Sequence, residues 1–331
     1  MSTIRLTGAQ PAGIAAARCD VLLGLRSTPK TLPPRWLYDA LGSDPFEQVT
    51  GPPQYHPAHI EREILRSRAA DIAVSTDART LVELGPGAPE KRRYLLDALP
   101  GLHTYVGANI DATARRQAGP ARTLERPDLS VHALVAGRAS PRALFSAPGR
   151  RLVTVLGGVF GALLPAEQAT FLDSVRNLLA DGDMLLLGVD LLTDPAAHLA
   201  GYDDPHGTTA ALNKRVVHAL NRELGADFDP DTFEHAALWN AAHERVEMRL
   251  RSCIEQTVKL PALDLALILA TGEELHTEVA AKFRQPDLLR QLSHSGLELQ
   301  RWFATPAQRC GLALVAPRVR PSAGHVTTCV R

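Results

Sequence analysis

The sequence predicts an α/β fold in which a mainly parallel sheet carries a small-molecule site and a second α+β unit is attached to it. Three observations support this prediction. A short apolar strand, a glycine turn and a helix follow one another at Leu81–Lys91. Strand and helix patterns then alternate as far as Asp190, which is typical of a parallel sheet with right-handed crossovers. Beyond that residue the alternation is lost, and segments typical of antiparallel strands follow.

The segment before the first strand is predicted to be helical. Ala12–Leu25 is rich in alanine and leucine and indicates a helix, and Trp36–Val49 indicates a second one that is interrupted near Gly42–Pro45. Gly51–Pro57 contains three prolines, which leave the backbone few conformations, so we expect a rigid loop there. Ala58–Val74 indicates a third helix, which leads into the sheet.

Leu81–Lys91 is the stretch around which we expect the site to form. Thr80–Leu84 has the length and β-branched content of a buried strand, and Pro89 is compatible with the first turn of a helix over Glu90–Leu99. Glycines in the turn Gly85–Gly87 allow a ligand to approach the backbone, and the helix start offers free N–H groups. The turn lacks the third glycine of the dinucleotide pattern and the Gly-Lys-Ser/Thr of a phosphate loop. A tight turn without a ligand is the alternative.

The remaining elements follow from the spacing of apolar residues. The parallel sheet is expected to continue with strands at His103–Ile110, Leu129–Val135, Arg151–Leu156 and Met184–Val189 and with a helix at Pro165–Ala180. The next unit is expected to contain helices at Asp194–Tyr202 and Thr208–Leu224 and strands at Phe233–Trp239, Arg245–Arg251 and Thr257–Leu260. A helix at Pro286–Ser295 and a hairpin of Gln300–Thr305 and Leu312–Val315 are expected to close the sheet.

This layout predicts two domains and a tail. The chain has 331 residues, which is enough for one large or two modest hydrophobic cores. Residues 61–195 and 282–316 are expected to form the ligand-binding sheet domain. Residues 1–60 and 196–281 are expected to form a substrate-binding domain, and residues 317–331 a loose tail.

Composition excludes several classes of protein. Lys plus Arg and Asp plus Glu both number 36, so nothing in the net charge indicates nucleic acid or an anionic membrane as a partner. The four cysteines are scattered, which argues against a zinc site or a disulfide framework and fits a reducing cytoplasm. No apolar stretch has the length of a signal peptide or a membrane span, and we expect a cytoplasmic monomer. His56 and His59 have a ligand-like spacing, but Pro57 favours a non-helical backbone there, so we predict no metal.

Long motifs run in order along nearly the whole chain. They are Pro29–Trp36, Tyr38–Asp44, Leu81–Lys91, Asp173–Asp190, Tyr202–Asp204, Asn221–Leu224, Arg245–Met248 and Thr277–Arg284. Together they resemble the histidine-specific methyltransferase family, typified by an enzyme that trimethylates the α-amine of L-histidine in the ergothioneine pathway. The resemblance implies a Rossmann-like class I methyltransferase sheet, S-adenosylmethionine (SAM) as the cofactor, and a small amino acid or amine as the substrate.

The resemblance also implies the residues of the site. The SAM site would be lined by Glu83, Gly85, Gly87, Lys91, Asn109, Gly137 and Arg138. The substrate pocket would be lined by Tyr38, Tyr55, Ala162, Tyr202, Met248, Glu278 and Ala280, with Tyr38 as the catalytic residue. Tyrosines supply rigid walls and hydroxyls, and a carboxylate accepts an N–H from an imidazole ring. A packing role for each tyrosine and a surface position for Glu278 are the alternatives.

Four positions depart from the family pattern. Asn109 stands where the family has an acid that holds the SAM ribose, and Val135–Arg138 stands where it has an Asp-Phe pair beside the adenine. Ala162 replaces an asparagine that grips the amino acid head of the substrate, and Ala280 replaces a serine near Glu278. Because charge-assisted hydrogen bonds are the stronger ones, we expect weaker SAM binding and altered specificity.

Three hypotheses for function follow. The first is a SAM-dependent methyltransferase acting on the amine of histidine or a related small amino acid or amine in specialised metabolism. The second is a SAM-dependent enzyme that transfers a non-methyl group, such as the aminocarboxypropyl tail. The third is a catalytically silent homologue that binds ligands. The tyrosines, Glu278 and the complete glycine turn favour the first hypothesis, with a changed substrate.

Overall fold

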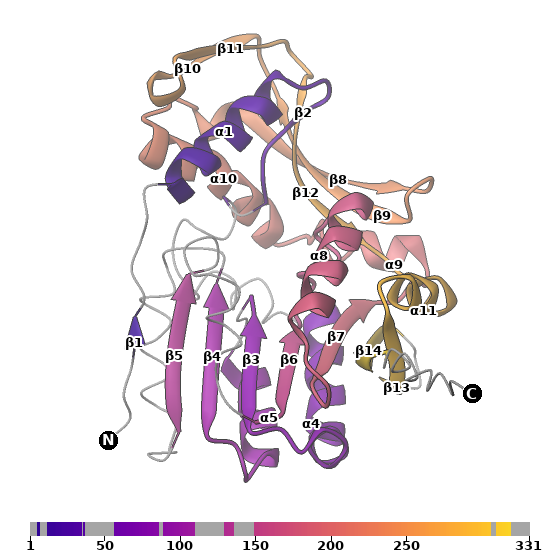
Figure 1. Ribbon diagram of the computed structural model, residues 1–331. Coiled ribbons are helices and arrows are strands. Elements are labelled where there is room, and N and C mark those ends of the chain that lie inside the picture. Colours follow the sequence, from indigo (N-terminus) through magenta and orange to yellow (C-terminus); the bar gives the residue numbers. More distant parts are fainter. Residues whose placement is uncertain are drawn as a thin grey trace, which may run out of the picture.

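The computed structural model describes residues 5–6, 12–34, 36, 56–85, 89–109, 129–135, 149–305 and 309–318. Its main sheet has eight strands in the order β1-β5-β4-β3-β6-β7-β14-β13 (Figure 1). The strands are β1 (Arg5–Leu6), β3 (Thr80–Leu84), β4 (Thr104–Asn109), β5 (Ser130–Val135), β6 (Arg151–Val155), β7 (Met184–Asp190), β13 (Leu297–Ala304) and β14 (Cys310–Pro317). Strand β14 runs antiparallel to both neighbours, and the other pairs are parallel. The predicted α/β fold class is confirmed.

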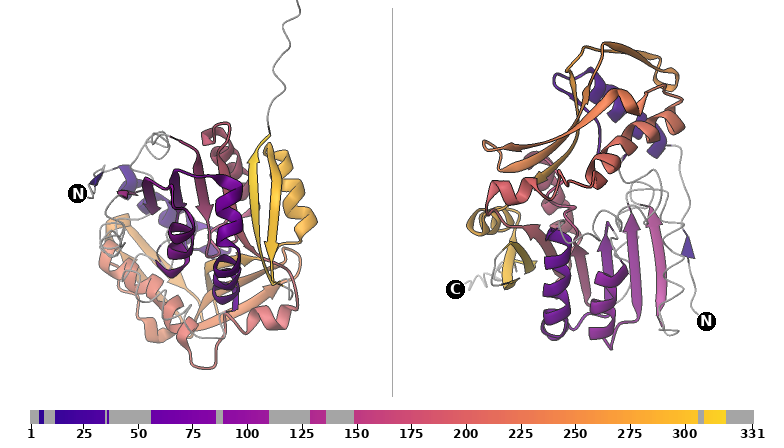
Figure 2. Two further views of the ribbon diagram at one scale, coloured as in Figure 1. Left: turned by 90° about the horizontal axis from the view of Figure 1, so that it is seen from below. Right: turned by 180° about the vertical axis from the view of Figure 1, so that it is seen from behind.

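Helices cover both faces of this sheet (Figures 1 and 2). They are α4 (His56–Thr76) and α5 (Pro89–Ala98) on one face and α8 (Pro165–Leu178) and α11 (Gln285–His294) on the other. Side chains of a strand alternate between the two faces, so Leu81 packs with α4 and α5 while Val82 packs with α8 and α11. A strand buried on both faces must be apolar at almost every position, which explains the continuous apolar runs in the sequence.

The strand order reverses between β3 and β6. Strand β3 pairs with β4 on one side and with β6 on the other. Strand β5 lies next to β4, and β7 lies next to β6, so the later strands are added outward in both directions. Open α/β sheets bind ligands at such a reversal, outside the carboxyl ends of the strands. In Figure 1 the arrowheads of β3, β4 and β5 point toward the second unit of the molecule. The topology therefore predicts a ligand site between the strand ends and that unit.

The second unit contains a four-stranded sheet and a hairpin. The sheet has the order β2-β12-β9-β8, and the hairpin pairs β10 with β11. These strands are β2 (Lys30–Thr31), β8 (Phe233–Asn240), β9 (Arg245–Ser252), β10 (Gln256–Leu260), β11 (Leu265–Leu269) and β12 (Glu274–Ala281). The helices of this unit are α1 (Ala12–Arg26), α9 (Pro195–Leu199) and α10 (Thr208–Leu224), with short 3-10 turns η2 (Pro230–Thr232) and η3 (Pro261–Leu263).

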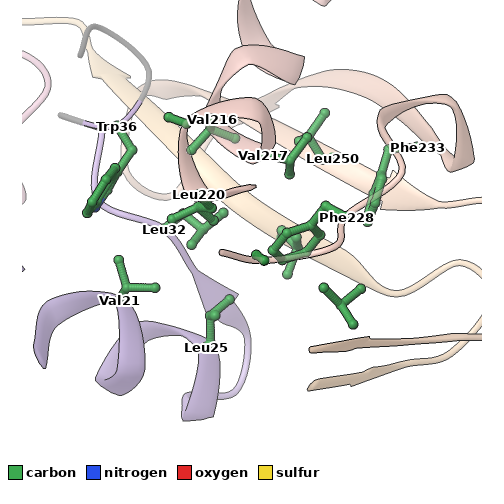
Figure 3. Packing of buried hydrophobic residues seen from close by; sticks show 14 of the residues in the cluster. Val21, Leu25, Leu32, Trp36, Val216, Val217, Leu220, Phe228, Phe233 and Leu250 are labelled. Carbon is green, nitrogen blue, oxygen red and sulfur yellow. The ribbon is translucent and has the colours of Figure 1, made fainter. Parts of the chain in front are cut away.

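One apolar cluster unites the N-terminal segment with the later part of the chain. Val21 and Leu25 of α1 lie in the same cluster as Val216 of α10 and Leu250 of β9, and each is at most 1% exposed (Figure 3). Residues almost 200 positions apart thus share a core, which supports the predicted grouping of the two segments. The predicted domain boundaries stay a prediction, and Arg5–Leu6 pairs with β5 in the eight-stranded sheet.

The structure differs from some of the sequence expectations. Strands β11 and β12 were not predicted, and β12 contains a bulge at Thr277 that breaks the two-residue alternation on which strand prediction depends. The expectation of a non-helical backbone at Pro57 was wrong, because α4 begins at His56 and proline is tolerated in a first turn. Beyond Trp36, the helix expected as far as Val49 lies outside the described residues, as does the tail from residue 319.

The described part of the chain has no helix that is long and apolar enough to cross a membrane. It also contains no group of three or more His, Cys, Asp and Glu side chains arranged to hold a metal ion.

Candidate active site

Two glycine turns approach each other at the point where the strand order reverses. Gly85, which follows β3, has φ +71°, and Gly157 and Gly158 after β6 have φ +74° and +81°. Glycine is the residue that adopts such angles without strain. A Cβ added to Gly85 would lie 2.9 Å from Val159 Cγ2, so glycine also allows the two turns to pack. A Cβ added to Gly158 meets no described atom within 4 Å, so the described residues leave space beside the backbone there.

Glu83 lies just before the first of these turns and is 5% exposed. Its Oε2 accepts hydrogen bonds from Arg92 Nε of α5 at 2.8 Å and from the Tyr105 hydroxyl of β4 at 2.7 Å. Burial and the adjacent Glu83 carboxylate raise the pKa of Tyr105 well above its ordinary value, so the phenol keeps the proton that it donates. The structure thus places Glu83 in an internal network that fixes α5 against the sheet.

Lys91 lies in the first turn of α5, and its side chain is 6% exposed. It forms an ion pair with Glu61 of α4, a residue that the sequence analysis did not identify. Glu61 also accepts the N–H of Gly157, at 3.0 Å to each carboxylate oxygen. One sequence signal was available: Glu61 occupies the apolar stripe of α4 that contains Ile64 and Leu65, where a charged residue needs a buried partner.

The residues predicted for the substrate pocket meet on the four-stranded sheet. Met248 of β9 pairs directly with Glu278 of β12, so both side chains lie on the same face. Ala280 pairs with Val246 on that face, two residues further along each strand. The bulge at Thr277 is fixed by its hydroxyl, which donates to Asn213 Oδ1 at 2.5 Å and to the Met248 carbonyl at 3.0 Å. This bulge sets the register that aligns Glu278 with Met248.

Tyr202 connects the two sheets through a buried lysine. Its hydroxyl accepts a hydrogen bond from Lys282 Nζ at 3.1 Å, and the same ammonium forms an ion pair of 2.8 Å with Asp190 at the end of β7. The Lys282 side chain is fully buried. Tyr202 also offers its carbonyl to His235 Nε2 of β8, at 2.8 Å. Tyr202 is therefore held from both sheets, as expected of a rigid pocket wall.

A backbone hydrogen bond joins the turn after β6 to the end of β12. Ala281 N–H donates to the Gly161 carbonyl at 2.9 Å, and Ala162 N–H donates to the Gly158 carbonyl at 3.1 Å. Ala162 and Ala280 are the chain neighbours of the joined residues, and both are half-buried. The connection brings the predicted cofactor turn and the predicted substrate strand together.

Some predicted site residues cannot be placed. Those outside the described residues are Tyr38, Tyr55, Gly87, Gly137 and Arg138. Asn109 ends β4, but its side chain is also outside the described part. Lys282 and Asp190, which hold Tyr202, were not among the predicted residues, although both occur within the quoted motifs.

A sequence model of a known family matches residues 17–317, and its description is histidine-specific methyltransferase, SAM-dependent. The chain belongs to this family. It is 45% identical over 302 residues to the histidine N-alpha-methyltransferase of Mycolicibacterium smegmatis, covering 90% of this chain and 94% of the relative. It is 43% identical over 310 residues to the protein of the same name from Mycobacterium tuberculosis, covering 93% and 97%. Among solved structures, the CcbJ methyltransferase of Streptomyces caelestis aligns with a TM-score of 0.44 at 14% identity, over 77% of this chain and 90% of that chain.

The protein is therefore a SAM-dependent methyltransferase, built on the eight-stranded α/β sheet described above. The geometry fits this cofactor, because open space beside Gly158 and the tight turn at Gly85 lie where α/β sheets bind ligands. When bound, SAM supplies an electrophilic methyl group on a sulfonium. The described residues hold the turns, fix the register of β12 and anchor Tyr202.

Proposed function

We propose that the enzyme methylates the α-amine of histidine or of a related small amino acid, and that Ala162 and Ala280 shift its preference away from unmodified L-histidine. The names of the two mycobacterial relatives support the first part. The alignment of Glu278 with Met248, beside the anchored Tyr202, supports an amino acid pocket at the end of β12. The backbone link between Gly161 and Ala281, which brings the two alanines to one junction, carries the second part.

The chemistry requires positioning more than proton transfer. An amine attacks the methyl carbon in line with the leaving sulfur, and it must be neutral to offer its lone pair. Glu278 has the carboxylate to accept a ring N–H of the substrate. Lys282 holds Tyr202, and a rigid hydroxyl keeps the amine in one orientation. Tyr38 as the catalytic residue, with Tyr55 as a further pocket residue, belongs to this proposal.

The cofactor side completes the proposal. We assign Gly85, Gly87 and Lys91 to SAM, with Glu83 holding the turn from behind. Asn109, Gly137 and Arg138 are assigned to the nucleoside end. We further propose a monomer that acts in the cytoplasm on a small molecule. The cysteines support this compartment, because none of the three described ones forms a disulfide; they are Cys19, Cys253 and Cys310.

The alanines define the expected specificity. A methyl group neither donates nor accepts, and a hydrogen bond to a carboxylate contributes roughly 1.5–3 kcal/mol, or about 10- to 150-fold in affinity. Unmodified histidine, whose carboxylate would be left without that partner, should bind weakly. A substrate with a bulkier or differently placed head group fills the space beside Ala162.

The test is Ala162→Asn, alone and with Ala280→Ser, assayed for histidine binding by calorimetry and for turnover by mass spectrometry. Turnover is followed through S-adenosylhomocysteine (SAH), which marks methyl transfer, and methylthioadenosine, which marks transfer of the amino acid tail. We expect SAH as the product and at least a tenfold tighter binding of histidine by the variants. Low-micromolar histidine binding by the wild type would contradict the assigned role of Ala162.

A further inference from the structure

Glu61 joins three segments at the carboxyl ends of the central strands. It reaches from α4 to the ammonium of Lys91 in α5 and to the N–H of Gly157 after β6. The side chains of Glu61 and Lys91 are only 4% and 6% exposed. The charge of Lys91 is therefore compensated by a protein carboxylate, because water has little access to it.

Neighbouring strands enclose the Glu61 carboxylate. Gly188 of β7 faces it, and a Cβ on Gly188 would collide with Glu61 Oε1. Cys310 of β14 lies on the same side, where burial and then the Glu61 charge raise the pKa of its thiol. A carboxylate enclosed by strands and helices in this way is a fixed feature of the site.

The position of this pair matters for the charge of the cofactor. A Cβ on Gly157 would lie 3.8 Å from Lys91 Nζ, so the lysine lies beside the turn at the reversal of strand order. SAM carries a net charge of +1 because of its sulfonium, whereas its product SAH is neutral overall. An uncompensated buried lysine at this position would repel SAM but not SAH.

We propose that Glu61 is a positioning residue for the cofactor, which holds Lys91 against the turn after β6 and cancels its charge so that the site accepts the cationic SAM. The inference depends on SAM as the cofactor and is independent of which amine is methylated. A purely structural role of Glu61 would leave the ratio of the affinities for SAM and SAH unchanged. The proposed role predicts that this ratio changes when Glu61 is replaced.

The experiment is calorimetric titration of SAM and of SAH into the wild type, Glu61→Gln and Lys91→Met. Glutamine keeps an acceptor for Gly157 but removes the negative charge, so we expect SAM to lose about five- to tenfold more affinity than SAH. Methionine removes the positive charge and leaves Glu61, so the ratio should shift in the opposite direction, whatever happens to the absolute affinities. In the double variant both charges are gone, and the ratio should return to that of the wild type.

The matched control is Asp183→Asn. Asp183 forms an equally buried ion pair with Arg151, but at the amino end of β6. This variant should be less stable and should keep the wild-type ratio of affinities. Equal losses for SAM and SAH in Glu61→Gln, or an unchanged ratio in Lys91→Met, would overturn the proposal and leave a structural role. If Glu61→Gln fails to fold, Lys91→Met alone decides.

Discussion

The two sheets of this protein place charged residues differently. In the described part of the eight-stranded sheet, the buried ion pairs lie near the strand ends. Glu61–Lys91, Glu83–Arg92 and Asp190–Lys282 lie near carboxyl ends, and Arg151–Asp183 lies at an amino end. The four-stranded sheet instead carries a row of charges along one side of β9, next to Glu274 of β12. This charged ladder consists of Arg245, Glu247, Arg249, Arg251 and Glu274.

The difference follows from what covers each sheet. Helices cover both faces of the first sheet, so a charge is tolerated only where a strand ends and a partner or a backbone N–H is at hand. One face of the second sheet packs into the cluster of α1 and α10, while the other keeps contact with water. Among the charges at the strand ends of the first sheet, the pair of Glu61 and Lys91 beside the glycine turns is therefore the one to test for cofactor affinity, and the pair of Lys282 and Asp190 is one to test for stability. Charges of the ladder are the ones to test for stability.

Gly85→Val should have the largest effect, the loss of measurable SAM binding. A β-branched residue at φ +71° is strained, and its Cβ would press against Val159 across the two turns. Calorimetry with SAM measures the effect, and circular dichroism checks the fold. Gly225→Val is the control, because Gly225 has φ +64° and ends α10, far along the chain from the turns. An unchanged SAM affinity in Gly85→Val would refute the cofactor site.

Lys282→Met should cost about 3 kcal/mol in the free energy of unfolding, since it leaves the carboxylate of Asp190 without its ammonium in a nearly dry site. Urea denaturation at neutral pH gives the value. Tyr202→Phe keeps the ion pair and should lose about 1 kcal/mol. Equal losses in the two variants would show that the ion pair between the sheets contributes little.

Glu247→Gln should have a smaller effect than Lys282→Met, about 2 kcal/mol at neutral pH after allowance for the partial exposure of its arginine partners. Burial raises the pKa of Glu247, but hydrogen bonds from Arg249, Arg245 and Asn240 outweigh it and lower the pKa from 4.5 to about 2. The folded protein therefore binds this proton less readily than the unfolded chain. The stabilisation is complete above the unfolded pKa and is lost as the pH falls toward 2.

Urea unfolding of the wild type and of Glu247→Gln at several pH values measures this dependence. The difference between the two proteins should shrink steadily below about pH 4.5. A difference that stays constant down to pH 2 would mean that Glu247 acts by packing, with no contribution from its charge.

Much of the fold is visible in the sequence because it depends on local periodicity. The strand Thr80–Leu84 and the helix Thr208–Leu224 have the predicted bounds. Their apolar spacing defines them together with Gly85 after the strand and with Gly207 and Gly225 at the two ends of the helix. Strand β12 was not predicted, because the bulge at Thr277 interrupts the alternation of side chains on which a strand prediction depends. That bulge is fixed by Asn213 from α10, more than 60 residues away in the chain.

The sequence by itself determined the glycine turn at Gly85, the family and the departures at Ala162 and Ala280, because each is a matter of residue type and order. Only the tertiary structure decided that Glu61 meets Lys91 and Gly157, and that Lys282 reaches both Asp190 and Tyr202. No local pattern contains these contacts. They exist because parallel strands end at one edge and buried charges must find partners there, wherever in the chain those partners come from.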